Sequence, residues 1–272
     1  MKKVKILDVQ FDVCNKDEAL SRILNLLETR SHEAAKQIVT PNPEMLLESQ
    51  KNPLFRETLN RAWMSIPDGA GILWAATFQG SSRGNGRFMR LFKAFWTLLG
   101  LILRPSSCRK IFSERITGVD LMQAICAVSS HSATPLFLLG AAPGIAEKTK
   151  EVLEAKYPGI KIVGTFSASP RDDDFMAIQA HIAETRPEIL FVAYGAPAQE
   201  LWIAQHLKKL PSVKLAMGTG GAFDFIAGTK KRAPKWMQKA GLEWLFRLIQ
   251  EPSRLKRIWN ATVRFPLRMI RL

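Results

Sequence analysis

The sequence predicts an α/β protein with a mostly parallel sheet flanked by helices and a C-terminal amphipathic helical appendage. Short apolar runs alternate with segments of helical periodicity, which is typical of βαβ units. Loops rich in glycine and proline follow several of these runs. Beyond residue 228 the runs end, and apolar residues recur at helical spacing instead. We therefore expect a Rossmann-like core over residues 1–228 and an appendage over residues 229–272.

The first predicted strand, residues 37–40, leads through Pro41-Asn42-Pro43 into a helix that begins near Glu44. Further strands are expected at 136–139, 160–165, 189–193 and 214–217, and helices at 145–156, 172–184 and 198–207. Right-handed crossovers place the loops after parallel strands along one edge of the sheet, where ligands bind. In the appendage we expect two or three amphipathic helices, interrupted at Pro252.

The composition is that of a folded protein, with 272 residues, 47% hydrophobic and 23% charged. The three cysteines are widely spaced and form no CxxC pair, which favours a reducing cytosol. Acidic residues follow the basic start of the chain, and no apolar run does. A signal peptide is therefore not expected.

The net charge of +15 is concentrated in two segments that are also rich in aromatic and aliphatic residues. Residues 230–272 carry twelve Lys/Arg and two acids, and residues 83–115 carry eight and one. The longest apolar stretch, Ala94 to Leu103, is about half as long as a membrane span. Its basic flanks favour a helix at a membrane surface over a buried one. This pattern suits a protein that binds an anionic membrane peripherally.

Asp68 is the sharpest candidate for chemistry. It is an acid in an apolar, small-residue segment, Ile66-Pro67-Asp68-Gly69-Ala70-Gly71, just before the apolar run 72–76. A carboxylate at this place can cap the following helix. Equally, partial burial can raise its pKa and make it a general base. The residues alone leave both interpretations open.

Residues after three predicted strands, and three arginines of the appendage, are further candidates. Asn42 either forms a simple turn or faces a ligand at the sheet edge. The loop 140–144 is either a tight turn or a phosphate cradle at a helix N-terminus. Gln199 either belongs to an ordinary helix start or reads a sugar hydroxyl or a uracil edge. Arg247, Arg254 and Arg257 either form a solvated face or bind phosphate oxygens with their guanidinium groups.

No metal site is expected. Asp172-Asp173-Asp174 resembles the DxD metal motif of sugar-nucleotide enzymes, but no buried strand precedes it. A solvated, capped helix start explains these acids better. The histidines show no ligand spacing.

Six segments, in order along the chain, together resemble the WecG/TagA/CpsF glycosyltransferases. They are IVTPNPEML (38–46), IPDGAGILWAA (66–76), ERITGVDLM (114–122), LFLLGAAPG (136–144), YGAPAQELW (194–202) and GTGGAFDFIAGTKKRAPKWMQKAGLEWLFRLIQEPSRLKR (218–257). The resemblance covers nearly the whole chain, and the last segment is its most specific part. One departure is an insertion of basic and apolar residues at about 79–112, which interrupts none of these motifs.

The resemblance implies an inverting, metal-independent transferase that uses no cofactor. Its donor would be a UDP-sugar, of the N-acetylmannosamine type or alternatively UDP-glucose or UDP-N-acetylmannosaminuronic acid. Its acceptor would be a polyprenyl-diphosphate-linked saccharide in cell-surface polysaccharide or teichoic acid synthesis. The expected location is cytoplasmic, peripheral on the inner face of the bacterial cell membrane.

The resemblance also implies roles for individual residues. Asp68 matches the catalytic base, and the substrate-binding residues would be Thr40, Asn42, Arg115, Gln199, Arg247, Arg254 and Arg257. The last three match arginines of the appendage that close over the active site and hold diphosphate.

Two other functions account for fewer of these sequence features than a glycosyltransferase does. The pI near 10.0 is compatible with a nucleic-acid-binding protein. However, a surface that binds a phosphate backbone needs cations and no apolar face, whereas the basic segments here are rich in Trp and Leu. A nucleotide-cofactor oxidoreductase would need GxGxxG and an acid about 20 residues further on, which the sequence lacks. We therefore expect no nucleic acid as partner. A homo-oligomer is compatible with the sequence.

Overall fold

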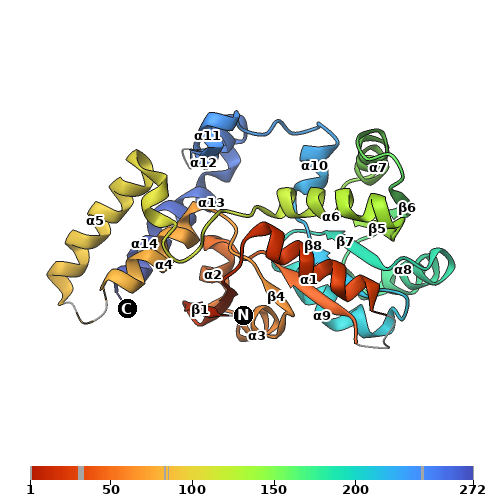
Figure 1. The fold of residues 1–272 in the computed structure, drawn as a ribbon, viewed down its shortest axis with the longest axis horizontal. Helices are drawn as coiled ribbons and strands as arrows, with labels where there is room; N and C mark the ends of the chain where they lie inside the picture. Colours follow the sequence, from red (N-terminus) through yellow and green to blue (C-terminus); the bar gives the residue numbers. More distant parts are fainter. Residues whose placement is uncertain (1, 30–33, 83, 85, 240–241, 272) are drawn as a thin grey trace.

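The protein is built around a six-stranded, all-parallel sheet with the strand order β4-β3-β8-β7-β5-β6 (Figure 1). The computed structural model describes residues 2–29, 34–82, 84, 86–239 and 242–271. The strands are β3 (Lys36–Val39), β4 (Met64–Ser65), β5 (Pro135–Gly140), β6 (Lys161–Phe166), β7 (Ile189–Ala193) and β8 (Leu215–Gly218). The predicted α/β class with a parallel sheet is confirmed.

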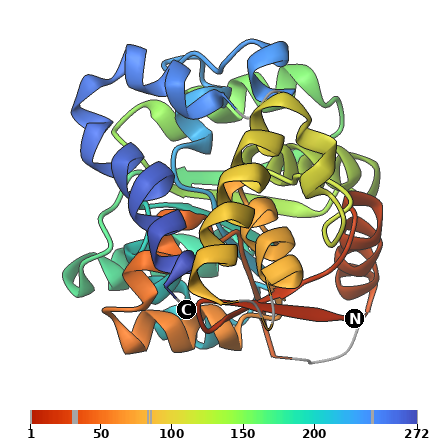
Figure 2. The ribbon, with the colours of Figure 1, turned by 90° about the vertical axis from the view of Figure 1, so that its left-hand side faces the viewer.

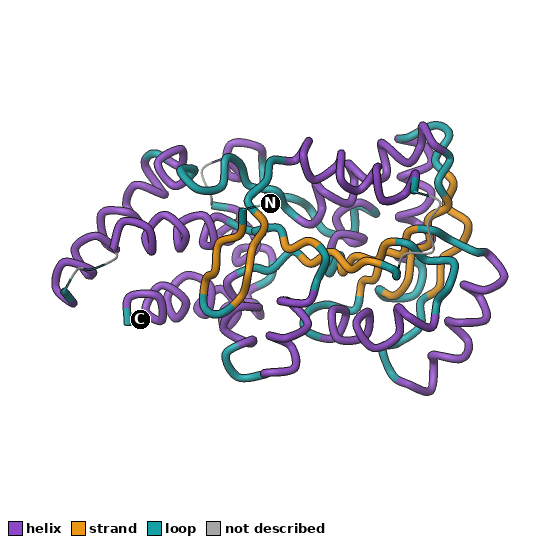
Figure 3. Tube along the Cα trace, turned by 60° about the horizontal axis from the view of Figure 1, so that its bottom comes forward, coloured by secondary structure: helices purple, strands orange, loops and turns teal. Residues whose placement is uncertain are grey.

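The central strands are apolar because helices cover both faces of the sheet. Every residue of β7 and β8 is buried. On one face lie α1 (Lys16–Glu28), α6 (Gly118–Ser132), α7 (Ile145–Lys156) and α10 (Ala222–Ile226). On the other face lie α8 (Asp172–Thr185) and α9 (Ala198–His206), joined by a short 3-10 turn at Leu207–Lys209 (Figure 3). Phe191 and Leu190, neighbours on β7, accordingly belong to different hydrophobic clusters.

An antiparallel hairpin that the sequence did not reveal precedes the sheet. It consists of β1 (Lys3–Ile6) and β2 (Val9–Asp12). Its side chains pack with those of α2 (Pro43–Ser49), α3 (Pro53–Arg61), α4 (Ala70–Ser82) and α5 (Arg87–Leu103) in a third cluster. The Asp12 carboxylate accepts the Ser65 N–H at 2.9 Å, which ties the hairpin to β4. A 3-10 turn at Pro105–Cys108 follows α5.

The C-terminal segment consists of short helices that run back along the core (Figure 2). They are α11 (Lys235–Lys239), α12 (Glu243–Gln250), a 3-10 turn (Pro252–Arg254), α13 (Leu255–Trp259), a π-helical turn (Asn260–Arg264) and α14 (Phe265–Ile270). The predicted interruption at Pro252 is confirmed, because α12 ends at Gln250. None of the helices in the described ranges is long and apolar enough to span a bilayer.

The last helix is firmly joined to the core. Phe265 and Met269 of α14 are fully buried in the cluster of α2 and α4, and the Phe265 ring lies 6.4 Å from that of Trp74. The end of the appendage therefore packs as part of the core, and a domain boundary at residue 228 stays a prediction.

Candidate functional site

Asp68 lies just beyond β4, at the carboxyl edge of the sheet. Its N–H donates to the Pro41 carbonyl at 3.1 Å, which joins the loop after β4 to the loop after β3. Among the described residues, no N–H in the first turn of α4 donates to the Asp68 carboxylate. Instead Oδ2 faces the N-terminus of α6, where the Gly118 N–H approaches it at 3.5 Å. The capping interpretation of Asp68 is therefore wrong, because the carboxylate turns away from the helix that follows it.

Burial raises the pKa of Asp68 to about 6. The positive charges of Arg115 and Arg247 act in the opposite direction, as does the Gly118 N–H, whereas the negative charge of Glu243 adds to the increase. A carboxyl group with this pKa is ionised at neutral pH and still basic enough to accept a proton. These are the properties of a general base.

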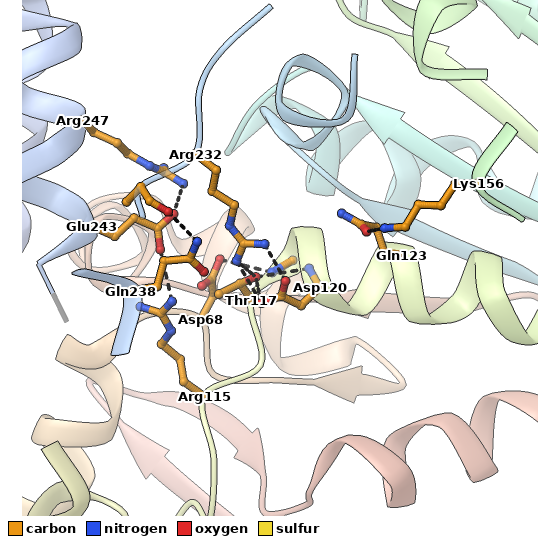
Figure 4. A network of polar contacts seen from close by, with 12 residues as sticks. Asp68, Arg115, Thr117, Asp120, Gln123, Lys156, Arg232, Gln238, Glu243 and Arg247 are labelled. Carbon is orange, nitrogen blue, oxygen red and sulfur yellow. Dashed lines mark hydrogen bonds and ion pairs between the residues drawn. The ribbon is translucent and has the colours of Figure 1, made fainter. Parts of the chain in front are cut away.

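The appendage meets the core beside Asp68 through one shared carboxylate (Figure 4). Glu243 of α12 accepts from Nη2 of Arg115 at 3.1 Å and from Nη2 of Arg247 at 3.0 Å. The Arg115 and Glu243 side chains are only 16% and 12% exposed. The Arg247 guanidinium also lies over the Phe225 ring, 4.9 Å from its centroid. Two guanidinium groups, one from the core and one from the appendage, are thus held next to the candidate base.

A second ion pair supports the N-terminus of α6 from the other side (Figure 4). Arg232 donates to both carboxylate oxygens of Asp120, at 2.6 and 2.9 Å, and to Oγ1 of Thr117 at 3.2 Å. Thr117 caps the helix, because its Oγ1 accepts the Asp120 N–H at 3.2 Å. Burial alone would raise the pKa of Asp120, but hydrogen bonds from Arg232 and Thr117 hold it below its usual range.

The other two arginines of the appendage lie apart from Asp68. Arg254 donates from Nε to Glu251, whose carboxylate also lies 3.4 Å from Nζ of Lys230. Arg257 donates from Nε and Nη2 to Oε2 of Glu44, at 3.0 and 2.8 Å. Arg257 thus pairs with the first turn of α2, which follows the loop after β3. The structure brings Arg247 to the candidate base and places Arg254 and Arg257 in pairs with glutamates.

Thr40 and Asn42 lie in the loop after β3. Thr40 is buried close to Asp68: a Cβ on Gly118 would lie 3.2 Å from Oγ1 of Thr40 and 4.0 Å from Oδ2 of Asp68. Asn42 caps α2, since its Oδ1 accepts the Met45 N–H at 3.0 Å. The turn interpretation of Asn42 therefore has a physical basis, and its contact with a ligand stays a prediction.

Gln199 is 5% exposed and connects two loops at the carboxyl edge. Its Oε1 accepts the N–H groups of Gly195 and Gly220, at 3.0 and 2.9 Å. Its Nε2 donates to Oε1 of the buried Glu200 at 2.7 Å. A Cβ at Gly218 would lie 2.6 Å from Nε2 of Gln199, so this bridge requires glycine there. The Gln199 side chain thus positions the loops after β7 and β8. Burial raises the pKa of its partner Glu200 to about 7.

The acidic run at 172–174 begins a helix, as predicted. The first residue of α8 is Asp172, and Oδ2 of Asp174 accepts the Ser169 N–H at 2.8 Å. In the described parts of the chain, no three His, Cys, Asp or Glu side chains are grouped so as to hold a metal ion.

The loop after β5 is a tight turn against the loop after β7. At Gly140, where φ is +91°, a Cβ would lie 2.7 Å from the Tyr194 ring.

Four residues of the site were not found from the sequence: Thr117, Asp120, Arg232 and Glu243. The pattern Thr117-x-x-Asp120 carried a recognisable capping signal. The spacing of Glu243 and Arg247 by four residues carried the signal of a helical ion pair. Arg232 stands in a basic run and has no local signal, because its partner lies 112 positions away.

Comparison with protein families gives one match over almost the whole chain. The model of the glycosyl transferase WecG/TagA/CpsF family matches residues 4–100 and 98–272.

Three curated relatives carry the name N-acetylglucosaminyldiphosphoundecaprenol N-acetyl-beta-D-mannosaminyltransferase. The protein of Bacillus spizizenii is 30% identical over 244 residues, which are 89% of this chain and 82% of the relative. That of Bacillus subtilis is 29% identical, covering 81% and 74%. That of Staphylococcus aureus is 27% identical, covering 96% and 90%.

Proposed function

Because the chain belongs to the WecG/TagA/CpsF family and is a glycosyltransferase, we propose that it moves N-acetylmannosamine from a UDP-sugar to a polyprenyl-diphosphate-linked saccharide. The names of the relatives support this sugar and an N-acetylglucosaminyl diphosphoundecaprenol acceptor. The product would enter cell-surface polysaccharide or teichoic acid. UDP-glucose and UDP-N-acetylmannosaminuronic acid are the alternative donors. The observation that carries the proposal is Asp68, with its pKa raised to about 6, beside the guanidinium groups of Arg115 and Arg247.

In the proposed reaction Asp68 takes the proton of the acceptor hydroxyl. The hydroxyl oxygen then forms a bond to the anomeric carbon of the donor, on the face opposite UDP. The bond between that carbon and the β-phosphate oxygen breaks, and its electron pair leaves with UDP. A single displacement of this kind inverts the anomeric configuration, and one carboxylate is sufficient as the base.

The departing UDP gains negative charge, which has to be offset. We propose that the guanidinium groups of Arg115 and Arg247 supply the compensating positive charge and that no metal ion is needed. Glu243 now lies between the two guanidinium groups, so a bound diphosphate would share or replace its hydrogen bonds. Thr40 and Gln199 would shape the pocket, and Arg254 and Arg257 would reach the diphosphate only after leaving Glu251 and Glu44.

We further propose that the enzyme acts on the inner face of the bacterial cell membrane, which holds the lipid-linked acceptor. Residues 229–272 would form a membrane-associating appendage. Their charge and exposed apolar side chains support this role: Trp236, Ile249, Leu255 and Trp259 are between 55% and 69% exposed. Each basic residue near an anionic leaflet adds about 1 kcal/mol of attraction.

A UDP-release assay tests the proposed reaction. The purified chain is incubated with each of the three UDP-sugars and a short-chain prenyl diphosphate that carries N-acetylglucosamine. We expect release with UDP-N-acetylmannosamine, an unchanged rate in EDTA, and an inverted anomeric centre in the product. Failure to release UDP from any of the three donors would overturn the proposal. Retention of configuration, or a rate abolished by EDTA and restored by Mg²⁺, would overturn the mechanism.

A further inference from the structure

Helix α5, the main element of the insertion, exposes a continuous apolar face. Six of its large side chains are 46–84% exposed: Phe88, Met89, Leu91, Phe92, Phe95 and Trp96. At about 100° per residue these six fall within an arc of about 160° around the helix axis. The rings of Phe92 and Phe95 both stand edge-on to Trp96, with centroids 6.0 and 5.9 Å away. The exposed residues therefore form one patch rather than scattered positions.

The opposite side of α5 holds the helix against the protein. Ala94 is 2% exposed, and Thr97 accepts a hydrogen bond from Nε1 of Trp74 at 2.9 Å. Arg90 donates from Nη2 to the Met269 carbonyl of α14 at 2.9 Å and lies over the Phe78 ring. Because this side is anchored to α4 and α14, folding of the helix against its own core does not cover the aromatic side.

Positive charge without an ion-pair partner among the described residues follows the C-terminal end of α5. Arg104, Arg109 and Lys110, which follow α5, are exposed and form no ion pair with any described residue. Anionic phospholipid complements aromatic side chains flanked by free cations. A second copy of this chain would bring like charges together and is disfavoured.

The patch lies at the same end of the molecule as the C-terminal helices. Figure 2 looks onto this end, with α5 and the C-terminal segment both toward the viewer. Leu267 of α14 is 45% exposed, and Trp259 is 55% exposed. A flat membrane in front of this end would meet α5 and the appendage from one side.

We propose that α5 is a second lipid-binding element of this chain, whose aromatic face enters the headgroup region of an anionic bilayer. The inference rests on the proposed function, which requires a membrane-bound acceptor. It assigns the attachment to two elements far apart in sequence, α5 and the appendage. The insertion would thereby set the angle at which the candidate site faces the membrane.

The first experiment removes the aromatic face from the full-length chain. Phe88, Phe92, Phe95 and Trp96 are changed together to serine, and flotation is measured with vesicles of phosphatidylglycerol and phosphatidylcholine in equal parts. Each aromatic withdrawn from the interface lowers the partition coefficient by about tenfold. Two of the four reaching the headgroup region already give a loss of about 100-fold, which is the smallest loss that we expect. Two exposed apolar residues of other surfaces, Leu54 and Met176, are changed to serine as the matched control, with no loss expected.

The second experiment places a dye in the proposed contact. All three native cysteines are buried, so a cysteine at position 95 or 176 is labelled selectively. An environment-sensitive dye on Phe95→Cys is expected to shift to the blue with anionic vesicles and not with phosphatidylcholine alone. The same dye on Met176→Cys is expected to stay unchanged. No shift at position 95 would refute the inference.

Transfer to the water-soluble, short-chain acceptor separates this inference from the proposed function. We expect the serine variant to keep the wild-type rate with that acceptor while it loses vesicle binding. Wild-type vesicle binding by the variant would overturn the role of α5 and leave the proposed reaction untouched. Dissociation of an oligomer together with unchanged vesicle binding would assign the patch to a contact between copies, and would also overturn the inference.

Discussion

Replacement of Asp68 by asparagine tests the central physical claim about the site in two ways. Asparagine keeps the shape of the carboxyl group and an oxygen for the Gly118 N–H, but it can neither ionise nor accept the proton. Loss of a general base lowers kcat by about 10²–10⁴-fold. The same change removes a buried charge, so stability is expected to increase while activity falls.

The size of the stability change follows from the pKa of Asp68, which burial raises from 3.8 to about 6. Because the native protein binds this proton more tightly than the unfolded chain, stability falls as the pH rises through that window. Above pH 6 the full cost of the ionised group is about 3 kcal/mol, and at pH 5 it is about 1.6 kcal/mol. Asp68→Asn should therefore be more stable by up to about 3 kcal/mol at pH 7.5 and by about half of that at pH 5.

Two assays on the same preparations measure these effects. UDP release gives kcat, and unfolding in guanidinium chloride at the two pH values gives the free-energy difference. Wild-type turnover by Asp68→Asn would remove Asp68 from its role as base. A variant less stable than the wild type at pH 7.5 would refute burial as the cause of the raised pKa.

Three other changes probe the surroundings of Asp68. At pH 5 activity should be about tenfold below its plateau, because only about one tenth of a carboxyl group with a pKa of about 6 is then ionised. Arg247→Gln removes a positive charge near Asp68 and should move this acid limb of the pH profile to higher pH, whereas Glu243→Gln removes a negative charge and should move it to lower pH. Gly218→Ala places a methyl group 2.6 Å from the amide that bridges two loops, and should cost about 1–3 kcal/mol of stability, measured by denaturant unfolding. Arg254→Gln should raise KM for the UDP-sugar by about 10-fold or more, measured by UDP release.

Each of these changes has a control. Shifts of the acid limb in the same direction for Arg247→Gln and Glu243→Gln would show that another group sets it. Gly86, the N-cap of α5, has nothing within 4 Å of an added Cβ, so Gly86→Ala should lower stability by less than about 1 kcal/mol. Arg271→Gln, at an exposed position after α14, is the control for Arg254→Gln. If both variants raised KM by the same amount, a specific contact between Arg254 and the diphosphate would be refuted.

Asp68 was recognisable in the sequence because an acid stood alone in an apolar segment of small residues, just before the apolar run 72–76. Its surroundings were not recognisable. Arg115 and Glu243 are 128 positions apart, and no local pattern indicates that they meet. Gln199 was placed correctly at a helix start, but its oxygen binds loop amides 4 and 21 positions away, so only the fold reveals it as a bridge. The hairpin β1–β2 was missed although its apolar residues alternate, because each strand is only four residues long and the Leu7-Asp8 turn lacks the usual Asn-Gly or Asp-Gly pair.

The sequence by itself determined the alternation of strands and helices, the parallel sheet, the break at Pro252 and the charged, aromatic character of two segments. These properties depend on periodicity and composition, which are local. Tertiary structure alone decided that Asp68 faces the start of α6, that Glu243 joins two arginines beside it, and which side of α5 stays exposed. These features depend on which loops the parallel crossovers bring to one edge of the sheet. They also depend on how far neighbours from every part of the chain remove a side chain from water.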